Sequence, residues 1–157
     1  MYEQGIGVAQ DAAKAAAIYR DGCERSGMGS CNRLGLLYEQ GAGAVKDPAQ
    51  AAALFQRACS RWHPDACVNL GRLLEAGTGI AKDPAKAATR YKLACDAGNG
   101  GGCYRLGLLY QQGIGVAADD SQAAALLQQA CKRGEPVACG VAPVPSAPPA
   151  APSAAPP

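Results

Sequence analysis

Long hydrophobic runs are missing from this sequence. No apolar stretch approaches the roughly 18 to 20 residues that a membrane-spanning helix needs, so we expect no membrane insertion. The first residues, Met1-Tyr2-Glu3, show neither the basic nor the apolar segment of a secretory signal. Runs of Lys and Arg are missing too. The 15 basic and 13 acidic residues are spread along the chain with a net charge of +2, which argues against nucleic acid as a partner.

Aromatic residues are also scarce. They make up 5% of the chain, with a single Phe, whereas Ala, Leu and Gly are abundant. Small side chains bury little apolar area each, so a stable core requires backbones that approach one another closely. This composition favours closely packed helices.

Cysteine, by contrast, is abundant and regularly placed. The chain of 157 residues contains eight cysteines in two series, and the interval within each series is 36 residues. The first series is Cys23, Cys59, Cys95 and Cys131, and the second is Cys31, Cys67, Cys103 and Cys139. Glycine and aspartate columns keep the same interval without an insertion. The chain therefore reads as repeats of one helical hairpin.

Local signals mark where the helices of each hairpin begin and end. Asp47-Pro48 and its equivalent Asp83-Pro84 combine a favourable N-cap residue with a favourable first helical residue, so a second helix is predicted to start there. Gly41 follows the preceding helix, where glycine closes the last turn in a left-handed conformation. Gly35, inside that first helix, predicts close contact with a neighbouring backbone.

The repeated motif resembles a known family. Each unit approximates Cys-x-x-Leu-Gly-x-Leu-Tyr-x-x-Gly-x-Gly-Val-x-x-Asp-x-x-x-Ala-Ala followed by Tyr-x-x-Ala-Cys, which is similar to the Sel-one-like repeat, and most similar to the Helicobacter cysteine-rich proteins. The resemblance covers residues 1–142 and implies an all-α fold, a right-handed α/α solenoid of tetratricopeptide-like hairpins with about four 36-residue repeats. It also implies an exported, oxidised protein, periplasmic or extracellular, with four bridges: Cys23 to Cys31, Cys59 to Cys67, Cys95 to Cys103 and Cys131 to Cys139.

The residues themselves leave three roles to weigh for each cysteine pair. Zinc sites usually place ligands two to four residues apart, whereas seven residues lie between the two cysteines of each pair here. His63 is the only histidine that could add a ligand. We therefore expect no metal or other cofactor and interpret His63 as a solvated turn residue. A catalytic role for a thiol is not supported, because the sequence contains no Cys-x-x-Cys redox motif. Structural disulfides fit best, because a short turn between helices can bring two cysteines within bridging distance.

Both ends of the chain depart from the repeat pattern. When the repeats are aligned, Met1 falls at the position of Leu37, and we expect a helix that begins at Cys139 to meet Pro143 within one turn. We therefore expect the chain to be a fragment of a longer array or a truncated relative. The preceding Ala-rich helix, around 122–132, should then expose apolar surface. Residues 143–157 are rich in Pro and Ala. They predict a disordered spacer, or alternatively a ligand for a proline-recognising groove or a tether.

Two functions compete for the repeats. Some cysteine-rich relatives are described as weak penicillin-binding or beta-lactamase proteins, but no Ser here is followed three positions later by Lys, so no catalytic residues can be named. The preferred function is a scaffold that binds a peptide or protein on the concave wall of the solenoid, although these positions could equally form a solvated helix face. The proposed contacts, which we expect to lie outside the core, are Asn32, Arg33, Asn69, Arg72, Tyr104 and Arg105.

Overall fold

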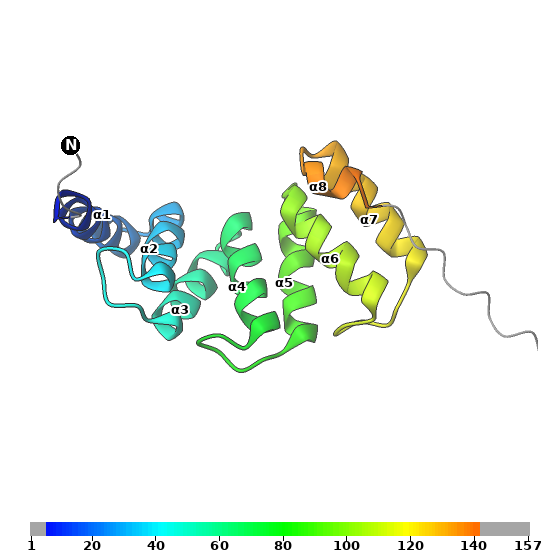
Figure 1. The fold of residues 1–157 in the computed structure, drawn as a ribbon, viewed down its shortest axis with the longest axis horizontal. Helices are drawn as coiled ribbons and strands as arrows, with labels where there is room; N and C mark the ends of the chain where they lie inside the picture. The colour runs from blue at the N-terminus through cyan, green and yellow to red at the C-terminus, as the bar shows by residue number, and fades with distance from the viewer. Residues whose placement is uncertain (1–5, 142–157) are drawn as a thin grey trace, which may run out of the picture.

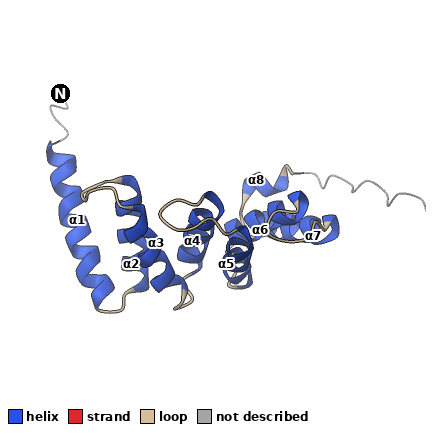
Figure 2. Cartoon of the chain, turned by 90° about the horizontal axis from the view of Figure 1, so that it is seen from below, coloured by secondary structure: helices blue, strands red, loops and turns tan. Residues whose placement is uncertain are grey.

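The structure is a computed structural model that describes residues 6–141, with side chains from residue 11 onward. Helices and loops make up this part of the chain, without a strand (Figure 2). In order, the helices are α1 (Ile6–Glu24), α2 (Met28–Gln40), α3 (Pro48–Cys59), α4 (Pro64–Ala76), α5 (Pro84–Asp96), α6 (Gly100–Gln112), α7 (Asp120–Lys132) and α8 (Pro136–Cys139). None of the helices within these residues combines the length and the apolarity that a bilayer crossing requires.

The helices stack in chain order into an arch (Figure 1). Each helix packs mainly on its sequence neighbours, so α2 with α3, α4 with α5 and α6 with α7 form three successive hairpins. The hairpin loops lie along the outer margin of the arch, and the N-terminal ends of α2, α4 and α6 lie toward its inner side (Figure 1). This is the helical solenoid that the 36-residue repeat predicts.

The predicted helix ends are confirmed. Asp83 caps α5 by accepting a hydrogen bond from the backbone N–H of Lys86 at 2.9 Å, and this bond holds the pKa of the Asp83 carboxyl below its usual value. Asp47 and Asp119 cap α3 and α7 in the same way. At the other end, Gly77 closes α4 with a left-handed φ of 73°, and its N–H donates to the carbonyl of Leu73.

The glycine inside the first helix of each hairpin makes room for one large side chain. A Cβ placed on Gly35 would lie 2.6 Å from Cε1 of Phe55, and one on Gly71 would lie 2.5 Å from Cε1 of Tyr91. Both rings are completely buried. The contact is therefore with an aromatic ring, and not with the neighbouring backbone as the sequence suggested.

A second glycine joins successive hairpins. Gly79, in the loop between α4 and α5, packs so closely on the backbone of Pro48 that no Cβ could be accommodated there. Gly115 makes the equivalent contact with Pro84. Close packing of a loop on the preceding hairpin fixes how the hairpins stack.

The C-terminal end differs from the sequence-based expectation. A one-turn helix, α8, begins at Pro136 and ends at Cys139, so the prediction of a helix beginning at Cys139 was wrong. Pro136 starts the helix because proline fits the first helical position. Beside it, α7 exposes an apolar cleft of about 410 Å³ lined by Ala124, Ala125, Leu127, Gln128, Cys131, Ala138, Cys139 and Val141. The predicted tail, 143–157, lies outside the described residues.

We predict that Gly71→Ala destabilises the fold by about 1 to 2 kcal/mol in chemical denaturation. Overpacking against the buried Tyr91 ring should cost about 2 to 3 kcal/mol, because the contact of 2.5 Å is severe, and the better helix propensity of Ala should offset about 1 kcal/mol of it. Gly107→Ala is the matched control, because its Cβ would lie 3.0 Å from Cγ of the more adaptable Leu127. Its loss should be smaller. A Gly71→Ala protein as stable as the parent would contradict this account of the core.

Candidate interaction groove

Four disulfides join consecutive hairpins, in the pairing that the family resemblance implies. Each links the end of one helix to the first turns of the next, with sequence separations of 8 and Cα–Cα distances of 4.5 to 4.9 Å. In the first three bridges every cysteine is at most 3% exposed. The last bridge is more open, because Cys131 is half-buried and Cys139 is exposed.

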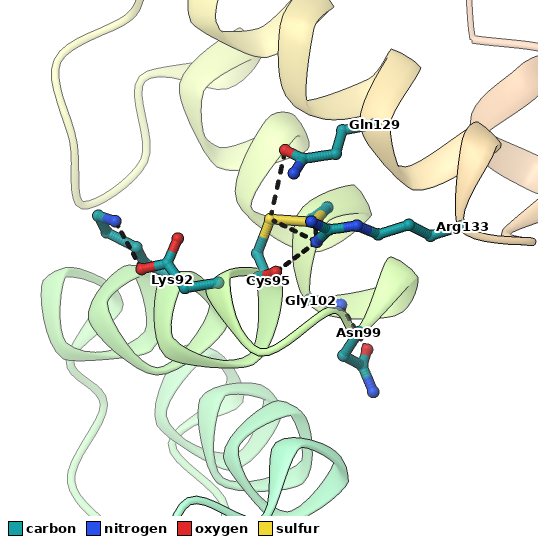
Figure 3. Close-up of a disulfide and its surroundings, with 8 residues drawn as sticks. Lys92, Cys95, Asn99, Gly102, Gln129 and Arg133 are labelled. Atoms are coloured by element: carbon teal, nitrogen blue, oxygen red, sulfur yellow. Dashed lines mark hydrogen bonds and ion pairs between the residues drawn. A yellow bond between two sulfur atoms is a disulfide. The ribbon is translucent and has the colours of Figure 1, made fainter.

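One disulfide is covered by an arginine from the following repeat. Nη1 of Arg133 donates to the carbonyl oxygen of Cys95 and lies 3.1 Å from Sγ of Cys103 (Figure 3). Gln129 also approaches, with Oε1 at 3.8 Å from Sγ of Cys95 (Figure 3). Side chains of α7 and its C-cap thus pack over the bridge that joins α5 to α6.

A groove of about 840 Å³ runs along the inner side of the arch, across the N-terminal halves of α2, α4 and α6. It is more polar than apolar and has charged groups of both signs. The residues that line it are Tyr19, Gly29, Ser30, Asn32, Arg33, Leu36, His63, Asp65, Val68, Asn69, Asn99, Gly100, Gly101, Arg133, Gly134 and Glu135.

Equivalent residues of successive repeats line the groove. His63, Asn99 and Glu135 are 36 residues apart, and each is the N-cap residue of its helix. His63 accepts a hydrogen bond from the N–H of Ala66 through Nδ1 at 3.3 Å, and Asn99 accepts one from Gly102 at 2.9 Å. His63 lies in the turn before α4, as predicted, and it is half-buried, because its ring caps the helix. Successive repeats therefore present equivalent positions to one surface.

Amide side chains bridge neighbouring repeats along the groove floor. Nδ2 of Asn69 donates to Oδ1 of Asn32 at 3.0 Å, and Nδ2 of Asn99 donates to Oδ1 of Asp65 at 2.7 Å. Asn32 is 6% exposed and is the one buried polar residue among residues 11–141. The expectation that Asn32 lies outside the core is therefore corrected, because its amide oxygen is committed to the contact between α2 and α4.

A second polar network lies further along the same helices. Arg72 donates through Nη1 and Nη2 to both carboxylate oxygens of Glu39, at 2.6 and 2.7 Å. These hydrogen bonds raise the pKa of the Arg72 guanidinium further, although burial opposes the rise. The hydroxyl of Tyr91 donates to Glu75 at 2.7 Å, and burial is the main reason that the pKa of Tyr91 is raised. These pairs fasten α2, α4 and α5 together.

The structure divides the six proposed contact residues into two groups. Asn32, Arg33 and Asn69 line the groove, whereas Arg72, Tyr104 and Arg105 are not among its lining residues. Arg72 is engaged with Glu39, and Tyr104 packs against the small apolar cluster around the Cys95–Cys103 bridge. Arg33 is exposed and makes no ion pair within the described side chains.

Several lining residues were not predicted from the sequence. Asp65, Asn99, Arg133 and Glu135 lie at or beside the turns that precede α4, α6 and α8. Their signal is present, since His63, Asn99 and Glu135 each stand four residues before the second cysteine of a pair. The predicted contacts lie on helix faces, whereas these positions belong to helix ends.

Fold and groove together define a disulfide-linked helical-repeat scaffold. The Sel1 repeat family matches residues 1–26, 29–61, 64–99 and 101–135, so the chain belongs to the Sel1 repeat family. A search of curated proteins returned no match. Repeats of this family generally serve as non-enzymatic modules for protein interaction.

Solved structures show the same fold. Helicobacter pylori cysteine rich protein B is 29% identical with a TM-score of 0.68, and the alignment covers 87% of this chain and 98% of that protein. A protective antigen of uropathogenic Escherichia coli with an SLR fold is 30% identical with a TM-score of 0.75, over 77% of this chain and 26% of the antigen. A Sel1 repeat protein from Oxalobacter formigenes is 24% identical with a TM-score of 0.72, over 83% and 56%. The chain thus spans 26% and 56% of the last two proteins.

We predict that the Cys131–Cys139 bridge is reduced first when the native protein is treated with a limiting amount of a thiol reductant. Exchange requires access of a thiolate to a sulfur, and Cys139 is exposed, whereas the other three bridges are buried. Alkylation followed by peptide mass mapping reads out the order. The fully oxidised chain should be eight hydrogens lighter than the reduced chain, since four bridges form. Earlier reduction of Cys95–Cys103 would contradict the prediction.

Proposed function

We propose that this chain is an interaction scaffold that binds an extended peptide, or an extended segment of a protein, in the groove across α2, α4 and α6. The observation that carries the proposal is that one groove crosses three repeats and is lined by equivalent positions in each. An extended peptide is periodic as well, and solenoids use such continuous surfaces for binding. We further propose that it works in the periplasm or outside the cell, where disulfides persist.

Polar groups in the groove suit a peptide backbone. The bond between Asn69 and Asn32 uses one half of each amide, which leaves Nδ2 of Asn32 to donate and Oδ1 of Asn69 to accept. A peptide unit offers the complementary acceptor and donor. Arg33 adds a planar cation that can pair with a carboxylate on a side chain or at a chain terminus. Leu36 and Val68 add apolar contact area.

The groove also explains why the scaffold needs its bridges. Few large side chains support the fold, and each disulfide closes a short loop, which contributes about 2 to 3 kcal/mol in the chain-entropy model. The bridges hold the turns that carry His63 and Asn99 in fixed positions. A preformed groove binds an extended segment without the entropic cost of ordering itself.

We predict that Arg33→Ala weakens peptide binding at least fivefold with little change in stability. The probe is a set of peptides selected from a randomised ten-residue library on the oxidised full chain, with affinities measured by fluorescence anisotropy. Arg33 is exposed, so its loss should change the free energy of unfolding by less than about 0.5 kcal/mol. Arg105→Ala is the control, because Arg105 does not line the groove. If Arg105→Ala weakens binding and Arg33→Ala does not, the wider helix face is the site.

The alternative function, a beta-lactamase-type hydrolase, has a direct test. The sequence contains no Ser-x-x-Lys motif. Nδ1 of His63 accepts a hydrogen bond from the N–H of Ala66, so this ring nitrogen already serves as a helix cap. We therefore predict that the purified oxidised chain hydrolyses a chromogenic beta-lactam no faster than buffer does. Turnover that scales with protein concentration and is lost in one single-residue variant would overturn this prediction.

A further inference from the structure

One turn position adopts a left-handed backbone in every repeat. Ser26, Trp62, Gly98 and Gly134 have φ values of 69°, 65°, 93° and 87°, and they are 36 residues apart. Each lies in the short turn that a disulfide closes. The left-handed region favours glycine, because a side chain brings Cβ too close to the following carbonyl oxygen. Two repeats have glycine at this position, as the backbone demands.

The second repeat has tryptophan at this position. Trp62 is the only tryptophan of the chain, and it is 73% exposed. At Gly98 and Gly134 an added Cβ would meet nothing within 4 Å, so a side chain at this position points into open space. Trp62 therefore combines a disfavoured backbone conformation with little burial of its ring.

Folding gives no reason for this residue. Bulky side chains at positive φ are outliers, and such strain is found at functional sites more often than elsewhere. An exposed indole also leaves a large apolar area in water, which a partner can cover. Tryptophan, tyrosine and arginine are enriched at the energetic centres of protein interfaces, and the exposed Arg61 directly precedes Trp62.

The surroundings connect Trp62 to the groove. Trp62 is not itself a lining residue, but the next residue, His63, lines the groove and caps α4, so the indole belongs to a turn at the edge of the groove. The Cys59–Cys67 bridge spans this turn with a Cα–Cα distance of 4.7 Å and restricts its movement. The tryptophan is therefore held on a fixed turn beside the groove.

We propose that Trp62 is an anchor for the bound peptide, whose apolar side chain packs on the indole while an adjacent acidic residue pairs with Arg61. This inference rests on the proposed function and specifies its ligand: an extended peptide with an apolar residue next to an acidic one. The groove positions the backbone of the peptide, and the tryptophan selects one of its side chains.

Trp62→Gly separates anchoring from folding. The substitution installs the residue that the third and fourth repeats already have, so the melting temperature of the oxidised full chain should not fall. Affinity for the library-selected decapeptides should drop at least tenfold. Ser26→Gly is the matched control, because it makes the same backbone change at an exposed equivalent position that carries no aromatic ring. Its peptide affinity should equal that of the parent. Trp62→Phe, which keeps an aromatic ring, should retain most of the affinity.

Trp62 also reports on binding directly. Because it is the single tryptophan, selectively excited fluorescence should shift to shorter wavelength when a peptide covers the ring. If Arg33→Ala weakens peptide binding but Trp62→Gly does not, the groove function stands and the anchor is refuted. If no library peptide binds the parent chain, the proposed function and the anchor both fail. A shift caused by anionic phospholipid vesicles, with none caused by peptides, would make Trp62 a lipid contact and refute the anchor.

Discussion

The disulfide between the end of one hairpin and the first turns of the next is the constraint on which the rest of this structure depends. Cys59 ends α3 and Cys67 lies near the start of α4, so the bridge fixes the direction in which each new hairpin leaves the previous one. The buried rings of Phe55 and Tyr91 can then occupy the spaces left by glycine. The groove follows from the same constraint, because its N-cap residues lie inside the bridged turns.

Most of the fold is encoded locally and could be predicted. Asp-Pro pairs start α3 and α5 where the N-cap rules place them, and Gly41 and Gly77 close the preceding helices in left-handed conformations. The 36-residue interval then leaves little freedom in the topology, because each hairpin must pack on its neighbours. The error at Cys139 arose because the start of the last helix was placed at the cysteine. The repeat places it at Pro136, which is 36 residues after Gly100, the first residue of α6, and 72 residues after Pro64, the first residue of α4.

The site was predicted less completely, for a physical reason. Periodicity identifies which positions share a helix face, but the stacking angle decides which end of that face is open. Arg72 belongs to the predicted face, yet the approach of α2 to α4 places it against Glu39, where the two side chains satisfy each other. Asn32 is buried by the same approach. Residues at helix ends, such as Asn99, take part because the turns surround the groove.

The short separation of the paired cysteines has a consequence for how the chain reaches this state. Eight cysteines can pair in about 105 ways, and many disulfide-rich proteins must search among wrong connectivities. Here every cysteine has its correct partner 8 residues away, whereas the nearest wrong partner is 28 residues away, from Cys31 to Cys59. Loop closure is more probable over the shorter span. Oxidation can therefore proceed hairpin by hairpin in the order in which the chain emerges, and no bridge has to wait for a distant part of the protein.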